Sequence, residues 1–143
     1  MPDPGADRWL PVSAPAGAAR EAAEAVRALN HATLSGTGYE WPGEVDDVIG
    51  ELQILAERLP QALRQAAEWV EDAHAAGRVG HDSGADATDA AVAEVLTELG
   101  HAERDAAFLA TSLRYARAHS SHLTGSRHDN EDDEDQDDDG GKR

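Results

Sequence analysis

The sequence predicts an all-α protein, an antiparallel bundle of three long helices followed by a disordered acidic tail. Apolar side chains recur at alternating intervals of four and three residues from Val45 to Val70, which keeps them on one side of a helix. No run of even six residues alternates β-branched or aromatic residues with polar ones, as a half-buried strand would. Only 4% of the 143 residues are aromatic, so the interior must be rich in alanine and its helices must approach closely.

The chain divides into an irregular arm (1–13), a helical bundle domain (14–123) and an acidic tail (124–143). Proline or glycine interrupts the arm four times, so it has no helical period. Two interpretations stay open for the arm. Either Trp9 and Leu10 pack onto the bundle, or they belong to a mobile end.

The first helix is expected to begin near Ser13, with Pro15 in the first turn, where its missing N–H has no cost. The glycine-containing segment 35–38 ends it. Its expected inward residues are Ala19, Ala22, Val26, Leu29 and Thr33.

The second helix is expected over residues 44–77. Pro60 lies inside it and should kink it, but the four-three spacing continues from Leu59 to Leu63, which predicts one continuous rod. Its expected inward stripe is Val45, Ile49, Leu52, Ala56, Leu59, Leu63, Ala66 and Val70. Gly77 and Gly80 end the rod.

The third helix is expected to begin near Asp86 and to fray around 119–123. Its expected inward residues are Val92, Val95, Leu99, Ala102, Ala106, Leu109, Leu113 and Ala116.

Helix lengths predict a bundle with one poorly covered end. At about 1.5 Å per residue the second and third helices span roughly 50 Å each, and the first only about 30 Å. The first helix should therefore lie against the first half of the second helix and the second half of the third. At the far end, Trp69 falls on a stripe beside the inward one, with Leu55, Leu59 and Ala62, and we expect two such ends to meet in a homodimer. The predicted interface consists of Leu63, Ala66, Trp69, Val70, Val92, Val95 and Leu99.

The net charge of −17 disfavours direct binding to nucleic acid or to an anionic membrane. Nine of the acidic residues are in the tail: Asp129, Glu131, Asp132, Asp133, Glu134, Asp135, Asp137, Asp138 and Asp139. The tail has no apolar residues with which to fold. It either engages a basic protein or only increases solubility.

The sequence offers little for catalysis. There is no cysteine, and no nucleophile elbow, phosphate-binding loop or EF-hand pattern. His119 and His122 are three residues apart with His128 nearby, but no carboxylate has ligand spacing there. We therefore expect no enzyme activity, no metal and no cofactor.

Two resemblances add to this interpretation. Trp41-Pro42-Gly43, between two expected helices, resembles the turn of the WXG100 family of small secreted helical hairpins; alternatively, Trp41 seals the end of the bundle. The helical region, including VRALNHATL, YEWPGEV and ERLPQAL, resembles small uncharacterised helical proteins of actinobacteria. That resemblance implies a bundle and no activity.

The sequence thus predicts a cytoplasmic, non-enzymatic helical adaptor or regulator that acts by protein–protein contact, most simply with a second copy. One alternative is an accessory protein of a DNA-handling plasmid or mobile-element system, with its acidic tail on a basic partner. Another is a secreted WXG100-like factor.

Overall fold

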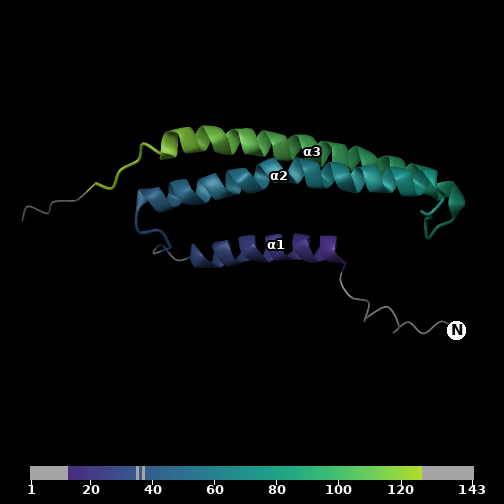
Figure 1. The fold of residues 1–143 in the computed structure, drawn as a ribbon, viewed down its shortest axis with the longest axis horizontal. Coiled ribbons are helices and arrows are strands. Elements are labelled where there is room, and N and C mark those ends of the chain that lie inside the picture. Colours follow the sequence, from purple (N-terminus) through teal and green to yellow (C-terminus); the bar gives the residue numbers. More distant parts are fainter. Residues whose placement is uncertain (1–12, 35, 37, 127–143) are drawn as a thin grey trace, which may run out of the picture.

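Three helices make up the fold, as the sequence predicts. The computed structural model describes residues 13–34, 36 and 38–126. The helices are α1 (Ala14–Ala32), α2 (Pro42–Ala75) and α3 (Ala85–Ser120), and no strand occurs among these residues (Figure 1). The predictions for the arm residues Trp9 and Leu10 and for the nine acidic residues of the tail concern positions outside the described residues.

The first helix begins where the sequence predicts. Ser13 is its N-cap, and the Ser13 hydroxyl accepts a hydrogen bond from the Ala16 N–H at 3.4 Å. After α1 the chain turns back closely at Gly38. A Cβ atom there would lie 2.6 Å from the Cα of Thr33, so this position requires glycine.

The second helix is continuous through Pro60, which confirms the single rod. It begins two residues earlier than expected, where the Glu44 carboxylate accepts hydrogen bonds from the backbone N–H groups of Glu40 (2.6 Å) and Trp41 (3.2 Å). It ends at Ala75 because Gly77 adopts a φ of 67°, and the Arg78 N–H then bonds back to the carbonyl of Ala73 at 2.8 Å.

α2 and α3 form an antiparallel hairpin that is packed along its length (Figure 1). The apolar residues buried between them are small, apart from one valine, so the two backbones approach closely. These residues are Ala56, Ala73, Val92, Ala106 and Ala110.

The register of the seam between α2 and α3 differs from the expected one. Ala66 and Leu59 are exposed, and their neighbours Ala67 and Pro60 are the ones half-buried. On α3 the predicted inward Val95 is likewise exposed. The same correction applies to Leu109 and Ala116, which are exposed although they were expected inside. The buried and half-buried residues still follow intervals of four and three, as in Ala56, Pro60, Leu63, Ala67 and Val70, so the seven-residue repeat is kept and one of its two stripes moves by one residue.

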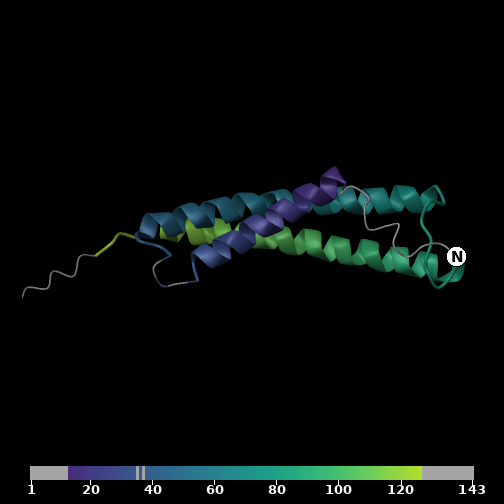
Figure 2. The same cartoon turned by 90° about the horizontal axis from the view of Figure 1, so that it is seen from below.

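α1 lies over the half of the hairpin where the sequence predicts it (Figures 1 and 2), but it packs less closely than expected. Figures 1 and 2 show α1 slanting across one face of the hairpin, over the half that holds the α2 start and the α3 end. It has no buried residue, and only α2 and α3 pack closely together among the described residues. The expected inward residues Val26, Leu29 and Thr33 are half-buried, and Ala19 and Ala22 are exposed. The bundle is thus a tight hairpin with a third helix standing away from it.

Candidate interaction surface

An open apolar cleft of about 1230 Å³ separates α1 from α2. On both walls its lining is almost entirely apolar, with alanine predominating on α1 and larger side chains on α2. Its apolar lining consists of Pro15, Ala18, Ala19, Ala22, Ala23 and Val26 from α1 and of Leu55, Leu59, Ala62, Ala66, Trp69 and Val70 from α2, and its two polar members are Ser13 and Gln65. The α2 residues include the Leu55–Leu59–Ala62–Trp69 stripe that the sequence analysis places beside the seam. Within the part of the chain that the structure describes, this face of α2 has no closely packed partner, and it is the main candidate site.

The apolar surface continues beyond the start of α1 toward the α2–α3 connection. Trp69 and Val70 also line a second hollow of about 250 Å³, together with Val79 from the connection and Ala91 and Val95 from α3. We call this region, residues 66–100, the distal end of the hairpin. In Figure 1 the distal end extends past α1.

Trp69 is the largest side chain of the distal end and is 61% exposed. The guanidinium carbon of Arg78 lies 5.8 Å from the centroid of its ring, within the range of a cation–π contact. Val95 opposite is 44% exposed. A tryptophan exposed to this extent contributes little to the stability of the fold, because large apolar rings stabilise a protein mainly when they are buried.

The structure divides the predicted interface residues into two groups. Ala66, Trp69 and Val95 are exposed; the first two line the cleft beside α1, and Val95 lines the second hollow. The other four are buried or half-buried: Leu63, Val70, Val92 and Leu99. Val70 and Val92 nevertheless contribute to the floor of the second hollow. Sequence reasoning did not find Val79 and Ala91, because a loop valine and one alanine among many carry no distinguishing pattern.

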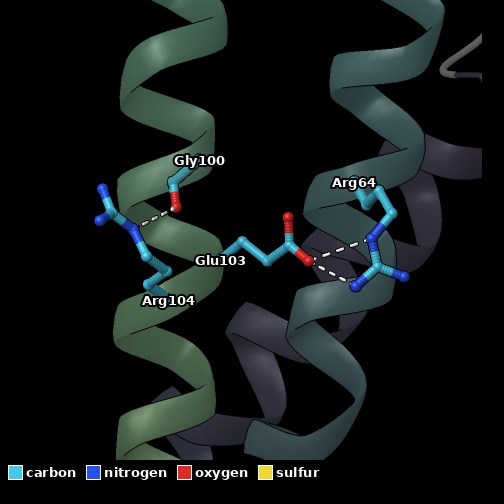
Figure 3. A network of polar contacts seen from close by, with 4 residues as sticks. All are labelled: Arg64, Gly100, Glu103 and Arg104. Carbon is cyan, nitrogen blue, oxygen red and sulfur yellow. Dashed lines mark hydrogen bonds and ion pairs between the residues drawn. The ribbon is translucent and has the colours of Figure 1, made fainter.

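A row of polar contacts joins α2 to α3. The contacts are Asp46–Ser120 (2.5 Å), Asp46–Arg117 (3.7 Å), Glu57–Arg114 (3.2 Å), Arg64–Glu103 and His74–Asp89 (2.8 Å). Glu57 follows Leu55 by two residues, which places it roughly 200° around the helix from the cleft. In Figure 3 the Arg64–Glu103 pair lies in front and the ribbon of α1 passes behind. The hairpin therefore has one face joined by polar contacts and another that is apolar.

Two members of this row have shifted pKa values. Hydrogen bonds from Gln53 and then from Arg114 hold the pKa of Glu57 below its ordinary value. The hydrogen bond to Glu103 raises the pKa of Arg64. Both shifts favour the charged forms that the ion pairs need.

Acidic charge is concentrated at the distal end. Residues 66–100 contain eight acidic side chains against Arg78 alone, a net charge of −7. α1 carries two acidic and two basic side chains and is neutral. Glu94 and Glu98 lie three residues after Ala91 and Val95 on α3, which places their carboxylates beside the second hollow but outside its lining.

The histidines and Trp41, which the sequence analysis also considered, do not come together in a binding site among the described residues. Among residues 13–34, 36 and 38–126, no three His, Asp or Glu side chains lie close enough together to hold a metal ion, and His128 is outside them. Trp41, of the WXG100-like turn, caps the start of α2 beside Gly125, and 66% of its surface is exposed.

No known protein family, curated protein or solved structure matches the chain. Within the described residues, no helix is both long enough and apolar enough to cross a membrane.

Proposed function

We propose that this protein is a non-enzymatic adaptor or regulator that acts by protein–protein contact through the apolar face of its α2–α3 hairpin. The observation that carries this proposal is the cleft of about 1230 Å³ between α1 and α2, which is lined by apolar side chains and continues to the exposed Trp69. Exposed, contiguous apolar surface of this kind is typical of interaction sites, and tryptophan is enriched among the residues that contribute most to binding.

The same surface supports several kinds of contact. A second copy of the chain is the partner expected from the sequence, and a helix from another protein would use the same side chains by lying in the groove. The proposal includes the cytoplasmic location expected from the sequence.

Photo-crosslinking in the cells that produce the protein tests this function. A benzophenone amino acid replaces Ala62 in the cleft in one variant and Trp69 in another, and the control replaces Phe108, which is 74% exposed on α3. We expect discrete crosslinked species from the two cleft positions and none from the control. No crosslink from either cleft position, or the same crosslinks from Phe108, would contradict the proposal.

A further inference from the structure

Among the described residues, no third helix covers the end of the hairpin beyond Val70. α1 begins at Ala14, and its first residues line the cleft together with Trp69 and Val70. Beyond that point α2 continues to Ala75, and the facing part of α3 begins at Ala85. On α2 the uncovered stretch is thus residues 71–75, or roughly 8 Å of helix, and on α3 it is the start of the helix that faces them.

The second hollow has the size and lining of a pocket for an apolar side chain. Its volume of about 250 Å³ is lined by Trp69, Val79, Ala91, Val95 and neighbouring apolar groups. For comparison, a cavity of about 150 Å³ accepts benzene. A leucine, phenylalanine or methionine from a helix lying along the distal end fits such a pocket in the manner of helix-in-groove recognition.

Charge selects among the possible occupants. Two distal ends that met about a two-fold axis would bring a charge of −7 against another −7, and like charges across an interface oppose association. The sequence of the chain's own residues 1–12, with three prolines and two aspartates against one arginine, predicts neither a helix nor a compensating positive charge. A basic amphipathic helix complements the surface in two ways, because its apolar side chains fit the hollow and its positive charge offsets the acidic residues.

We infer that the distal end binds a basic amphipathic helix of another protein, which completes a three-helix arrangement with α2 and α3. This inference rests on the proposed function and names its partner class. Apolar side chains of the bound helix, spaced three and four residues apart, contact Trp69, Val95 and the hollow between them. Its lysine or arginine side chains pair with the bordering carboxylates, Glu94 and Glu98 among them.

The test uses the full chain and two model peptides of about 16 residues, each with leucine on one helical face. One peptide carries lysine at the other positions and the second carries glutamate. In protein with Trp9→Phe and Trp41→Phe, Trp69 is the only tryptophan, so its emission reports contact at the distal end. We expect saturable binding of the lysine peptide with a blue shift of Trp69 emission, and no binding of the glutamate peptide.

Matched variants separate this site from general attraction to acidic protein. Measured by calorimetry, Trp69→Ala should weaken binding of the lysine peptide at least about tenfold, and Trp41→Ala should leave it unchanged. The double variant Glu94→Gln, Glu98→Gln should weaken binding of the lysine peptide severalfold. The control double variant Glu21→Gln, Glu40→Gln should leave that binding unchanged. Equal effects of each variant and its control would overturn the inference.

The competing occupants give their own results. A blue shift of Trp69 that grows with protein concentration, together with the mass of a dimer in light scattering, would overturn the inference in favour of a second copy. Trp69 emission that is already blue-shifted in the free monomer, and that shifts back to the red when Trp9→Ala and Leu10→Ala are introduced, would overturn the inference in favour of the N-terminal arm. This variant also carries Trp41→Phe, so that Trp69 is again the only tryptophan. If Ala62 and Trp69 crosslink in cells but the lysine peptide does not distinguish Trp69→Ala from Trp41→Ala, the partner class is wrong and the proposed function stands.

Discussion

The Arg64 guanidinium donates two hydrogen bonds to one carboxylate oxygen of Glu103, and the pair joins the middle of α2 to the middle of α3 (Figure 3). The donor nitrogen Nε lies 3.0 Å from that oxygen. With the other polar contacts on the same face, this pair fixes the alignment of two helices whose buried contacts are mainly between alanines.

A double-mutant cycle of Arg64→Ala and Glu103→Ala should give a favourable coupling energy at low ionic strength. The coupling should shrink at 1 M salt, because both side chains are partly exposed and salt screens their attraction. Denaturant unfolding measures it. The pair Arg27–Glu24, which lies within α1, is the control, since it does not join the two long helices. Absence of coupling at low salt would show that the pair does not hold the hairpin together.

Replacing Pro60 with alanine should leave the melting temperature unchanged or raise it. The substitution restores a backbone N–H in the middle of α2 and removes the clash of the proline ring with the preceding turn, an effect of up to about 3 kcal/mol. Loss of ring contacts in the seam, where Pro60 is half-buried, offsets part of this gain. A fall of many degrees in thermal unfolding, with Pro15→Ala as the control, would mean that the hairpin requires the proline.

Two glycine substitutions should act in opposite directions. Gly77→Ala should destabilise the protein by about 1 kcal/mol, because Gly77 has a φ of 67° that side chains with a Cβ atom disfavour. Gly100→Ala should stabilise it by about 0.5–1 kcal/mol, since Gly100 lies inside α3 with open space for a methyl group. Urea unfolding of both variants measures these differences. Equal signs for the two variants would contradict the assigned backbone conformations.

The stabilising effect of Glu57 should depend on pH. Its pKa in the folded protein is lower than in the unfolded chain, because Gln53 and then Arg114 bind the ionised carboxylate. The contribution is therefore complete above the ordinary carboxyl pKa and is lost as the pH falls through the lowered pKa. The difference in melting temperature between wild type and Glu57→Gln should be positive at neutral pH and vanish in acid. A difference that is independent of pH would exclude this linkage, and Glu21→Gln on α1 serves as the control.

The helices themselves follow from local signals in the sequence. Ser13 before a proline-containing first turn, Pro42-Gly43 and Gly77 mark helix ends, because each has a specific backbone or capping role there. The uninterrupted apolar spacing across Pro60 was sufficient to predict one rod. These signals act within a few residues, so they can be interpreted without knowledge of the rest of the fold.

The register of the α2–α3 seam and the packing distance of α1 are harder to predict, because the sequence allows alternatives that bury nearly the same apolar area. Ala66-Ala67 and Val95-Leu96 offer two apolar neighbours each, and a rotation of one residue exchanges them at little cost in buried area. The alanine face of α1 buries too little area per residue to determine how closely it packs. The cleft was therefore not predictable, although the stripe of α2 residues that lines it with Trp69 was.

The most direct test of this account is collisional quenching of Trp69 by acrylamide, which is neutral and so unaffected by the acidic surface. One variant retains only Trp69 and another only Trp41, and both are measured at a concentration where light scattering gives the monomer mass. The two residues are 61% and 66% exposed, so we expect similar quenching constants. A Trp69 quenched several times less than Trp41 in the monomer would show that the apolar face is already covered, and the open interaction surface proposed for this protein would be wrong.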